Sequence, residues 1–316
     1  MLSARGPVVH HVYGIDVRTP WPVSGTPETD RDRWDVEFIE GTAATFADAA
    51  ARVPQVQASW WAKSATLPDG STYRRWNDAF EFLVMPDARQ IHARRLRSTT
   101  HHEALLAYLL VDALSFSLVR LGREPLHATT VARDGGAVAF IGPSGAGKST
   151  LAALLLDGAS RLLTDDMLVL REDGDQFLAQ PGPTRIKLYR AIADRLLGSA
   201  YAGIPMNADT EKLIIPLNGA QAAAVPHPLV ALYVIDVDNH TNTRGKPSIQ
   251  KLTPASAVPV ILAATASHYP SERDRLARQF GFVTRLARQV PARLLSYRHD
   301  PDSMLSVRDA VLGDLG

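Results

Sequence analysis

One eight-residue segment constrains this 316-residue chain more than any other feature. Residues 142–149 read Gly-Pro-Ser-Gly-Ala-Gly-Lys-Ser and match the phosphate-loop pattern G-x-x-x-x-G-K-[ST]. Glycines let successive backbone N–H groups turn inward around phosphate oxygens, and the following helix directs its positive end at the same anion. The context that the motif requires is present, because an apolar strand is expected at 137–141 and a leucine-rich helix at 148–157. The segment therefore predicts a nucleotide-phosphate site in an α/β domain.

Two side chains of this loop have distinct predicted roles. Lys148 supplies a full positive charge to the β- and γ-phosphates, and the Ser149 hydroxyl is a ligand for Mg²⁺. The cofactors expected at the site are therefore ATP and Mg²⁺. The residues predicted to bind the nucleotide are Gly142, Ser144, Gly145, Ala146, Gly147, Lys148, Ser149 and Thr150.

A pair of aspartates follows the loop and its helix closely in the sequence. Asp165 and Asp166 come directly after a short apolar strand expected at 161–164. A carboxylate at the end of a strand beside a phosphate loop is where metal-binding acids of such proteins lie. The alternative is that both aspartates only cap a turn. The neighbouring loop favours a functional role, in which one carboxylate receives the proton of a substrate hydroxyl and the other holds Mg²⁺, directly or through water.

The chain divides into two predicted parts, residues 1–122 and 123–316. All five tryptophans lie within the first 76 residues, which indicates that the first part is a separate unit. A strand at 8–17, a strand at 34–39, a hairpin over 79–94 and a helix over 102–121 predict a small β-rich α+β unit. Further elements are expected in the second part, with strands at 126–132, 168–171 and 230–237, a polar loop at 238–247, and helices at 189–197, 255–264, 271–290 and 301–315.

Composition excludes several classes of protein. The chain has no cysteine, so disulfides and thiolate zinc sites are excluded. A net charge of +1 gives no bulk attraction to nucleic acid. No apolar run is judged to approach the ~18–20 residues of a membrane span, and residues 1–20 lack the pattern of a signal peptide. We therefore expect a cytoplasmic protein without a nucleic-acid or membrane partner.

Several segments resemble the HPr kinase/phosphorylase family and its shorter relatives, most strongly over residues 125–190. In that family a histidine strand precedes the phosphate loop and a double aspartate follows the loop's helix, as in Leu126-His127-Ala128, GPSGAGKST and RLLTDD here. The stretch PGPTRIKL at 181–188 is similar to a proline–arginine stretch of the relatives, and YGIDVRTPWPV at 13–23 resembles their opening. The relatives include kinases that phosphorylate a hydroxyl side chain of lasso-peptide precursors.

The resemblance implies a fold, a reaction and a set of roles. The fold is a phosphate-loop kinase domain of the HPr kinase C-terminal type, preceded by the β-rich unit. Asp165 is implied as the catalytic base and Asp166 as the metal ligand beside Ser149. His127 resembles an active-site histidine of the family, although a strand histidine with a satisfied hydrogen bond is the alternative. Lys212 is similar to a basic position of the relatives.

Other charged and histidine residues are open to two interpretations. Arg185 and Lys187 alternate on an expected strand and so share one face, where they could neutralise phosphate, meet an acidic substrate or be solvated surface charges. His101 and His102 are expected at the exposed start of a helix and not at a metal site. The arginines of 273–288 are expected to form a solvated helix face.

These features favour an ATP-dependent kinase that acts on a serine or threonine hydroxyl of a peptide or protein, possible substrates including a lasso-peptide precursor. A nucleotide-dependent switch or ATPase and a small-molecule kinase are the alternatives. No separate glutamate or glutamine stands out that would activate water, and no guanine-reading N/T-K-x-D motif is present. The glycine-rich signature associated with phosphorolysis is also missing, so the resemblance implies neither that reverse reaction nor HPr as the substrate. Homo-oligomer formation stays open.

Overall fold

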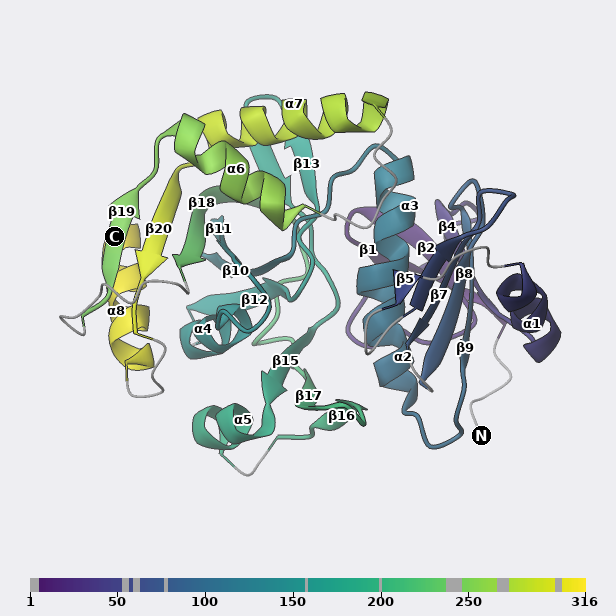
Figure 1. Ribbon diagram of the computed structural model, residues 1–316. Coiled ribbons are helices and arrows are strands. Elements are labelled where there is room, and N and C mark those ends of the chain that lie inside the picture. Colours follow the sequence, from purple (N-terminus) through teal and green to yellow (C-terminus); the bar gives the residue numbers. More distant parts are fainter. Residues whose placement is uncertain are drawn as a thin grey trace.

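The computed structural model places the two predicted parts of the chain on either side of a long central helix (Figure 1). Secondary structure in the first 95 residues belongs to one sheet with a short helix beside it, and the strands of the remaining sheets come after residue 127. The structure describes residues 6–52, 57–58, 63–76, 79–156, 159–198, 201–236, 246–265, 273–298 and 303–316. Most of the expected loop at 238–247, and the ends of helices expected at 157, 271 and 301, lie outside these residues.

The first sheet has nine strands in the order β3-β1-β2-β4-β9-β8-β7-β6-β5. The segment expected to be one strand at 8–17 is instead two strands, because Tyr13 and Gly14 turn the chain with φ of 56° and 74°. The expected hairpin over 79–94 is confirmed. The elements are β1 Val8–Val12, β2 Ile15–Thr19, β3 Glu28–Thr29, β4 Val36–Glu40, α1 Ala43–Ala51, β5 Gln57–Ala58, β6 Lys63–Thr66, β7 Thr72–Trp76, β8 Phe80–Val84 and β9 Gln90–Arg95.

The long central helix packs its apolar side chains against this sheet. It consists of α2 (His102–Tyr108), a π-helical turn (Leu109–Ala113) and α3 (Leu114–Arg120), and Gly122 follows it with φ of 76°. By length and composition it is apolar enough to cross a membrane, which the sequence analysis did not recognise. However, 72% of its most apolar window is buried inside the molecule, as expected for a core helix.

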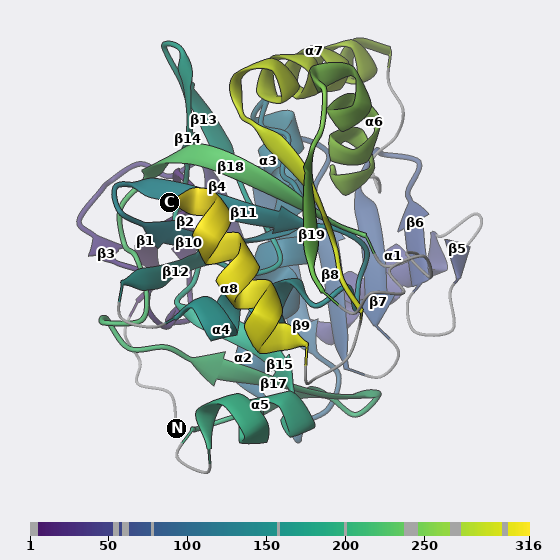
Figure 2. The same ribbon diagram turned by 90° about the vertical axis from the view of Figure 1, so that its left-hand side faces the viewer.

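The second part is built on an eight-stranded mixed sheet with helices on both faces (Figure 2). Helices α6 and α7 cover one face and α4 and α8 the other, each with its own apolar core. The strand path is β12-β10-β11-β18-β14-β13, with β20 beside β18 and β19 beside β20. The elements are β10 Ala128–Arg133, β11 Gly136–Ile141, α4 Lys148–Leu155, β12 Ser160–Thr164, β13 Leu170–Asp173, β14 Gln176–Ala179, β18 His227–Asp236, β19 Ser248–Lys251, α6 Pro254–Ala264, α7 Arg273–Gln289, β20 Ala292–Ser296 and α8 Met304–Leu315.

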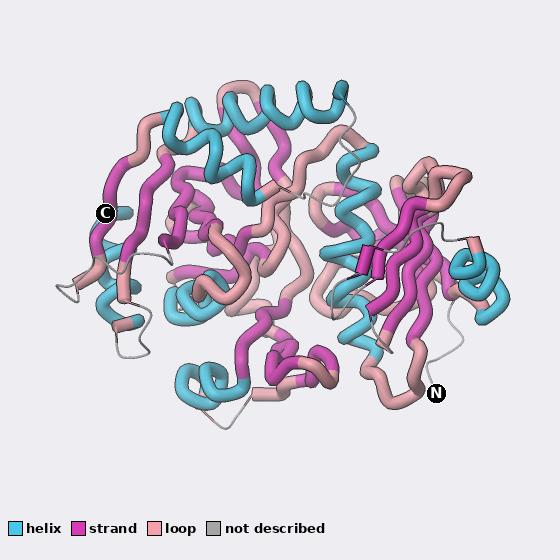
Figure 3. Tube along the Cα trace, viewed as in Figure 1, coloured by secondary structure: helices cyan, strands magenta, loops and turns pink. Residues whose placement is uncertain are grey.

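A small third sheet forms an arm beside α4 and the central helix (Figure 3). Its order is β15-β17-β16, with β15 at Arg185–Tyr189, β16 at Ile204–Asn207 and β17 at Thr210–Pro216, and helix α5 (Arg190–Leu197) continues from β15. Ile214 of this arm packs into the core of the first part, together with Met167 and Val169. The two parts of the chain therefore share apolar core.

The fold class expected from the sequence is confirmed: an α/β phosphate-loop domain follows a β-rich α+β part. The expectation for the arginines of α7 is wrong at one position. Arg275 is buried, and its guanidinium lies 3.4 Å from a carboxylate oxygen of Glu124. Arg285 of the same helix is exposed, as expected, and pairs with Glu172 at 2.8 Å.

Candidate functional site

The expected site residues meet at one edge of the central sheet. Strand β10 is antiparallel to both β11 and β12, so these two run in the same direction and end at the same edge. The phosphate loop leaves the carboxyl end of β11, and Asp165 follows the carboxyl end of β12. His127 lies at the amino end of β10, between them. The topology therefore explains why segments 20 residues apart in sequence form one site.

The phosphate loop has the backbone that its glycines allow. Gly142, Gly145 and Gly147 have φ of 152°, 85° and 91°, and Gly147 caps the start of α4. The Lys148 ammonium is buried and donates hydrogen bonds to the carbonyls of Gly142 and Pro143 at 2.8 and 2.9 Å. The loop is thus closed around its own lysine, in the position from which Lys148 reaches phosphate.

A tyrosine that the sequence analysis did not single out supports this loop from the far side. The hydroxyl of Tyr297, just after β20, donates to the carbonyl of Ala146 at 3.0 Å. Both residues are buried. The loop is therefore attached to the sheet at a second point, about 150 residues away along the chain.

Asp165 is fixed by three donors from three different elements. Its Oδ1 accepts from the hydroxyls of Ser149 at 2.8 Å and Thr129 at 2.7 Å. Its Oδ2 accepts from the backbone N–H of Lys187 at 2.8 Å. Asp165 thus joins the start of α4, strand β10 and strand β15. Thr129 was not among the expected site residues.

Asp166 points to a different set of groups. Its Oδ2 pairs with the ammonium of Lys187, and its backbone carbonyl lies 3.0 Å from Nδ1 of His127. Its φ of 69° lies in the left-handed region, which aspartate tolerates better than most residues but which still stores strain. The two neighbouring carboxylates therefore contact different groups.

Charges in this cluster shift several pKa values. Burial, followed by the negative charge of Asp166, raises the pKa of Asp165. Burial also acts to raise the pKa of Asp166, but the positive charge of Lys187 and its hydrogen bond to the carboxylate outweigh burial, so this pKa is lowered. The pair thus has one firmly ionised carboxylate, Asp166, and one that retains its proton more readily.

The two other titratable groups of the site respond mainly to burial. Burial lowers the pKa of Lys148 to about 8, although both aspartates oppose this shift. Burial, together with Lys148, lowers the pKa of His127, so the imidazole is neutral near pH 7. A neutral His127 donates from Nδ1 to the Asp166 carbonyl and has an acceptor lone pair at Nε2.

The three expected substrate residues occupy different positions. Lys187 lies within the site, paired with Asp166. Lys212 pairs in register with Tyr189 on the arm, lies 5.2 Å from that ring, and is close enough to lower the pKa values of Lys148 and Asp166. Arg185 is instead buried against the central helix, with its guanidinium donating to the Leu106 carbonyl at 3.2 Å and lying 3.4 Å from Glu103.

The residues present fit a magnesium ion of the kind that phosphate-loop proteins use. The Ser149 hydroxyl and the Asp165 carboxylate place two hard oxygen ligands together at the start of α4. Among the described residues there is no group of three or more histidine and acidic side chains that could hold a metal by itself. This suits Mg²⁺, which keeps several waters and takes phosphate oxygens as further ligands.

The histidines at 101 and 102 have a structural role in the described part of the chain. His101 is exposed and caps α2, accepting a hydrogen bond from the backbone N–H of Glu103 at 3.3 Å. The ring of His102 lies 5.8 Å from that of Trp21. Both histidines lie at the start of a helix as expected, but only His101 is exposed, whereas His102 is half-buried.

Comparison with known proteins gives a match to a family model and matches to solved structures. A family model described as "ScmC: SynChlorMet cassette protein ScmC" matches residues 110–228, a span that includes the phosphate loop, the two aspartates and the arm. The chain is also similar to the solved structure of the Hpr(Ser) kinase/phosphatase from Coxiella burnetii, with 15% identity and a TM-score of 0.32, over 60% of this chain and 90% of that one. No curated protein matches the chain.

Proposed function

We propose that this protein is an ATP-dependent kinase that transfers the γ-phosphoryl group to a serine or threonine hydroxyl of a peptide or protein. One observation carries the proposal: a phosphate-loop hydroxyl, Ser149, is hydrogen-bonded to one carboxylate of an aspartate pair whose other carboxylate lies beside Lys187. Phosphoryl transfer needs a phosphate cradle, a metal ligand set and a group that accepts the hydroxyl proton. These residues supply all three.

The geometry favours assigning the two aspartates in the opposite order to the one that the resemblance implies. Asp165 contacts Ser149 and so lies where the metal ligands gather, whereas Asp166 has no such contact among those described. We therefore assign the metal to Ser149 and Asp165, and the acceptance of the substrate proton to Asp166. Bound Mg²⁺ would neutralise charge that develops on the phosphates.

Each remaining residue acts on the transferred group or its acceptor. Lys148 leaves the loop carbonyls and neutralises the β- and γ-phosphates. Lys187 keeps Asp166 ionised through their ion pair. A lowered pKa at Asp166 does not disqualify it, because in a loose transition state the hydroxyl proton leaves only as the bond to phosphorus forms. His127 holds the backbone of Asp166 through its Nδ1 contact.

Mass spectrometry tests the proposal directly. The protein is incubated with ATP, Mg²⁺ and a library of serine- and threonine-containing peptides, and products are analysed for the mass of one phosphate on one residue. The expected product is a phosphoester that is stable to mild acid. Lys148→Met protein is the matched control and should give no product.

Three results would contradict the proposal. The first is ATP hydrolysis at the same rate with and without any peptide, which indicates a switch or ATPase. The second is transfer only to free sugars or nucleosides, and the third is an acid-labile phosphate on the product.

A further inference from the structure

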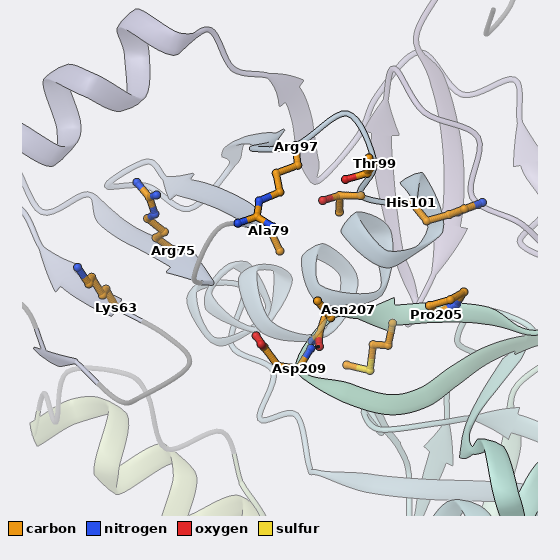
Figure 4. Close-up of a pocket in the computed structure, with 12 residues that line it drawn as sticks. Lys63, Arg75, Ala79, Arg97, Thr99, His101, Pro205, Asn207 and Asp209 are labelled. Carbon is orange, nitrogen blue, oxygen red and sulfur yellow. Dashed lines mark hydrogen bonds between the residues drawn. The ribbon is translucent and has the colours of Figure 1, made fainter.

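A large cavity lies between the first part of the chain and the tip of the arm (Figure 4). Its volume is about 820 Å³. One wall comes from β6, β7 and the segment that leads into α2, and the other from the β16–β17 hairpin. No residue assigned to phosphoryl transfer lines it. The cavity is therefore separate from the nucleotide site, and the proposed reaction does not by itself explain it.

Positive charge dominates the lining. Lys63, Arg75 and Arg97 contribute three cationic side chains from the first part, and the arm contributes the carboxylate of Asp209. Arg75 also pairs with Glu81 at 3.4 Å, which offsets its charge, so the proposal depends mainly on Lys63 and Arg97. Figure 4 shows Lys63 and Arg75 toward one end and His101 and Pro205 toward the other. Lys63 and Arg97 are exposed, so an incoming ligand can reach them. Such a lining attracts an anionic ligand, because opposite charges within a concave surface raise its local concentration.

The cavity is connected to the reaction centre through one tyrosine. Asn207, in the cavity wall, donates a hydrogen bond to the Tyr108 hydroxyl. Tyr108 packs against the apolar core that contains Met167, the residue after Asp166. Burial raises the pKa of Tyr108 to about 12, the Asn207 hydrogen bond opposes this shift, and the charge of Asp166 adds to it.

The arm provides a second connection between the cavity and the reaction centre. Lys212, whose charge helps to lower the pKa of Asp166, lies two residues beyond Thr210, the partner of the cavity residue Asn207 in the hairpin. At roughly 3.3 Å per strand residue, Lys212 is only a short distance along the strand from Thr210.

We propose that this cavity binds an acidic segment of the peptide acceptor while the acceptor hydroxyl reaches Asp166. The inference rests on the proposed function for its substrate and adds where and through what charge that substrate is recognised. A hydroxyl at Asp166 would have its neighbouring residues beside Tyr108 and Asn207, at the entrance to the basic lining. The positive charges would then fix the orientation of the chain rather than act on the phosphoryl group.

Nucleic acid, like an acidic peptide, would be attracted by positive charge. The net charge of +1, however, gives the chain no general attraction for a polyanion. The observations thus favour an acidic peptide.

Fluorescence anisotropy without ATP tests the inference independently of catalysis. The probe is a fluorescein-labelled oligoglutamate peptide with one central serine. Charge reversal at both exposed cations, Lys63→Glu with Arg97→Glu, should weaken its binding by about tenfold or more, and Asp209→Asn should strengthen it. Raising the salt concentration should weaken binding to the unmodified protein. Calorimetry with ATP should give the same affinity for the double variant as for the unmodified protein.

A matched control separates local recognition from net charge. Lys251→Glu with Arg190→Glu changes the charge equally at two exposed positions, on β19 and α5, that do not line the cavity. This control should bind the peptide as the unmodified protein does. The inference is overturned if both double variants lose affinity equally, if neither does, or if a labelled oligothymidylate binds more tightly than the peptide. Since binding is measured without transfer, a failed kinase assay with intact peptide binding contradicts the proposed function and not the cavity's role.

Discussion

The Ser149 hydroxyl donates a 2.8 Å hydrogen bond to Oδ1 of Asp165, and this contact joins the start of α4 to the end of β12. The same carboxylate accepts from Thr129 and from the backbone of Lys187. Asp166, the next residue, has its carboxylate on Lys187 instead. Adjacent carboxylates thus contact Ser149 in one case and Lys187 in the other, the two sides to which we assign the metal and the acceptor, so mutation can test the two roles separately.

Asparagine substitutions should separate binding from chemistry. Asp166→Asn keeps the shape of the side chain and tolerates the left-handed backbone, but its amide is a poor proton acceptor. We expect retained binding of ATP with Mg²⁺ and transfer reduced by about 10²–10⁴-fold, the usual contribution of a general base. Asp165→Asn should instead abolish the effect of Mg²⁺ on nucleotide affinity. Calorimetry with and without Mg²⁺, together with single-turnover transfer, distinguishes them; the reverse pattern would restore the order implied by the family resemblance.

Lys148 should couple nucleotide binding to proton uptake. Burial lowers its pKa to about 8 in the free protein, and a bound phosphate would raise that pKa again. Above pH 8, Lys148 is therefore deprotonated in much of the free protein, and it should take up a proton when ATP binds. Affinity should fall as the pH rises from 7 to 9, and calorimetry at pH 8.5 in buffers of different ionisation enthalpy should detect the uptake. Lys148→Met should bind ATP far more weakly and show no such uptake; equal uptake by both proteins would contradict the prediction.

The same shift has a consequence for stability. The pKa of Lys148 in the folded protein lies below 10.5, the ordinary value for a lysine in an unfolded chain. Between these two values the unfolded chain binds more protons than the folded one, so this residue makes the free energy of unfolding increase with pH in that range. The decrease in the free energy of unfolding that buried Lys148 causes is fully present below pH 8. Lys148→Met should remove it, and the difference in unfolding free energy between the two proteins should shrink as the pH rises from 8 to 10, measured by urea denaturation.

The parts of the site that could be predicted are those in which a local pattern has only one structural use. The glycines and the lysine of 142–149, and the pair Asp165-Asp166, can each be recognised from a few consecutive residues. Thr129 and Tyr297 could not be found in this way, because Thr129 meets Asp165 and Tyr297 meets the loop carbonyl of Ala146 only through the register of strands that are far apart in sequence. Their residue types are ordinary for strand positions and carry no signal of their own.

Fold predictions failed where backbone conformation overrides side-chain pattern. Residues 8–17 are apolar and β-branched enough for one strand, yet Tyr13 adopts φ of 56° and the chain reverses there. The π-helical turn at Leu109–Ala113 leaves the apolar spacing of the central helix nearly unchanged, so periodicity does not reveal it. Arg185 and Lys187 share a strand face as expected, but their surroundings differ. Arg185 packs against the central helix beside Glu103, whereas Lys187 pairs with Asp166 in the site.

Arg185 should behave as a structural residue and not as a substrate-binding one. Its guanidinium is buried, donates a hydrogen bond to the Leu106 carbonyl and lies 3.4 Å from a carboxylate oxygen of Glu103. Arg185→Ala leaves Glu103 partly buried without its cation, and removal of one partner from a buried pair costs about 3–5 kcal/mol. A large fall in the melting temperature is expected. Arg190→Ala, an exposed arginine on α5, is the control and should melt as the unmodified protein does. Unchanged stability with a raised KM for the peptide would contradict this prediction.

Gly182 tests how closely the segment before β15 is packed beneath the site. A Cβ atom at this position would lie 2.3 Å from Oγ1 of Thr164 and 2.8 Å from a ring carbon of Tyr13, closer than real Cβ contacts. Thr164 immediately precedes the aspartate pair, and Tyr13 is buried at the turn of the first hairpin, so neither side chain has free space to move into. Overpacking of this kind typically costs about 1–3 kcal/mol. Gly182→Ala should therefore lower the melting temperature and, by displacing Thr164, also lower the transfer rate. Gly219→Ala is the matched control, because a Cβ there meets nothing within 4 Å. Thermal unfolding of both variants checks the prediction, and equal melting temperatures for the two would refute it.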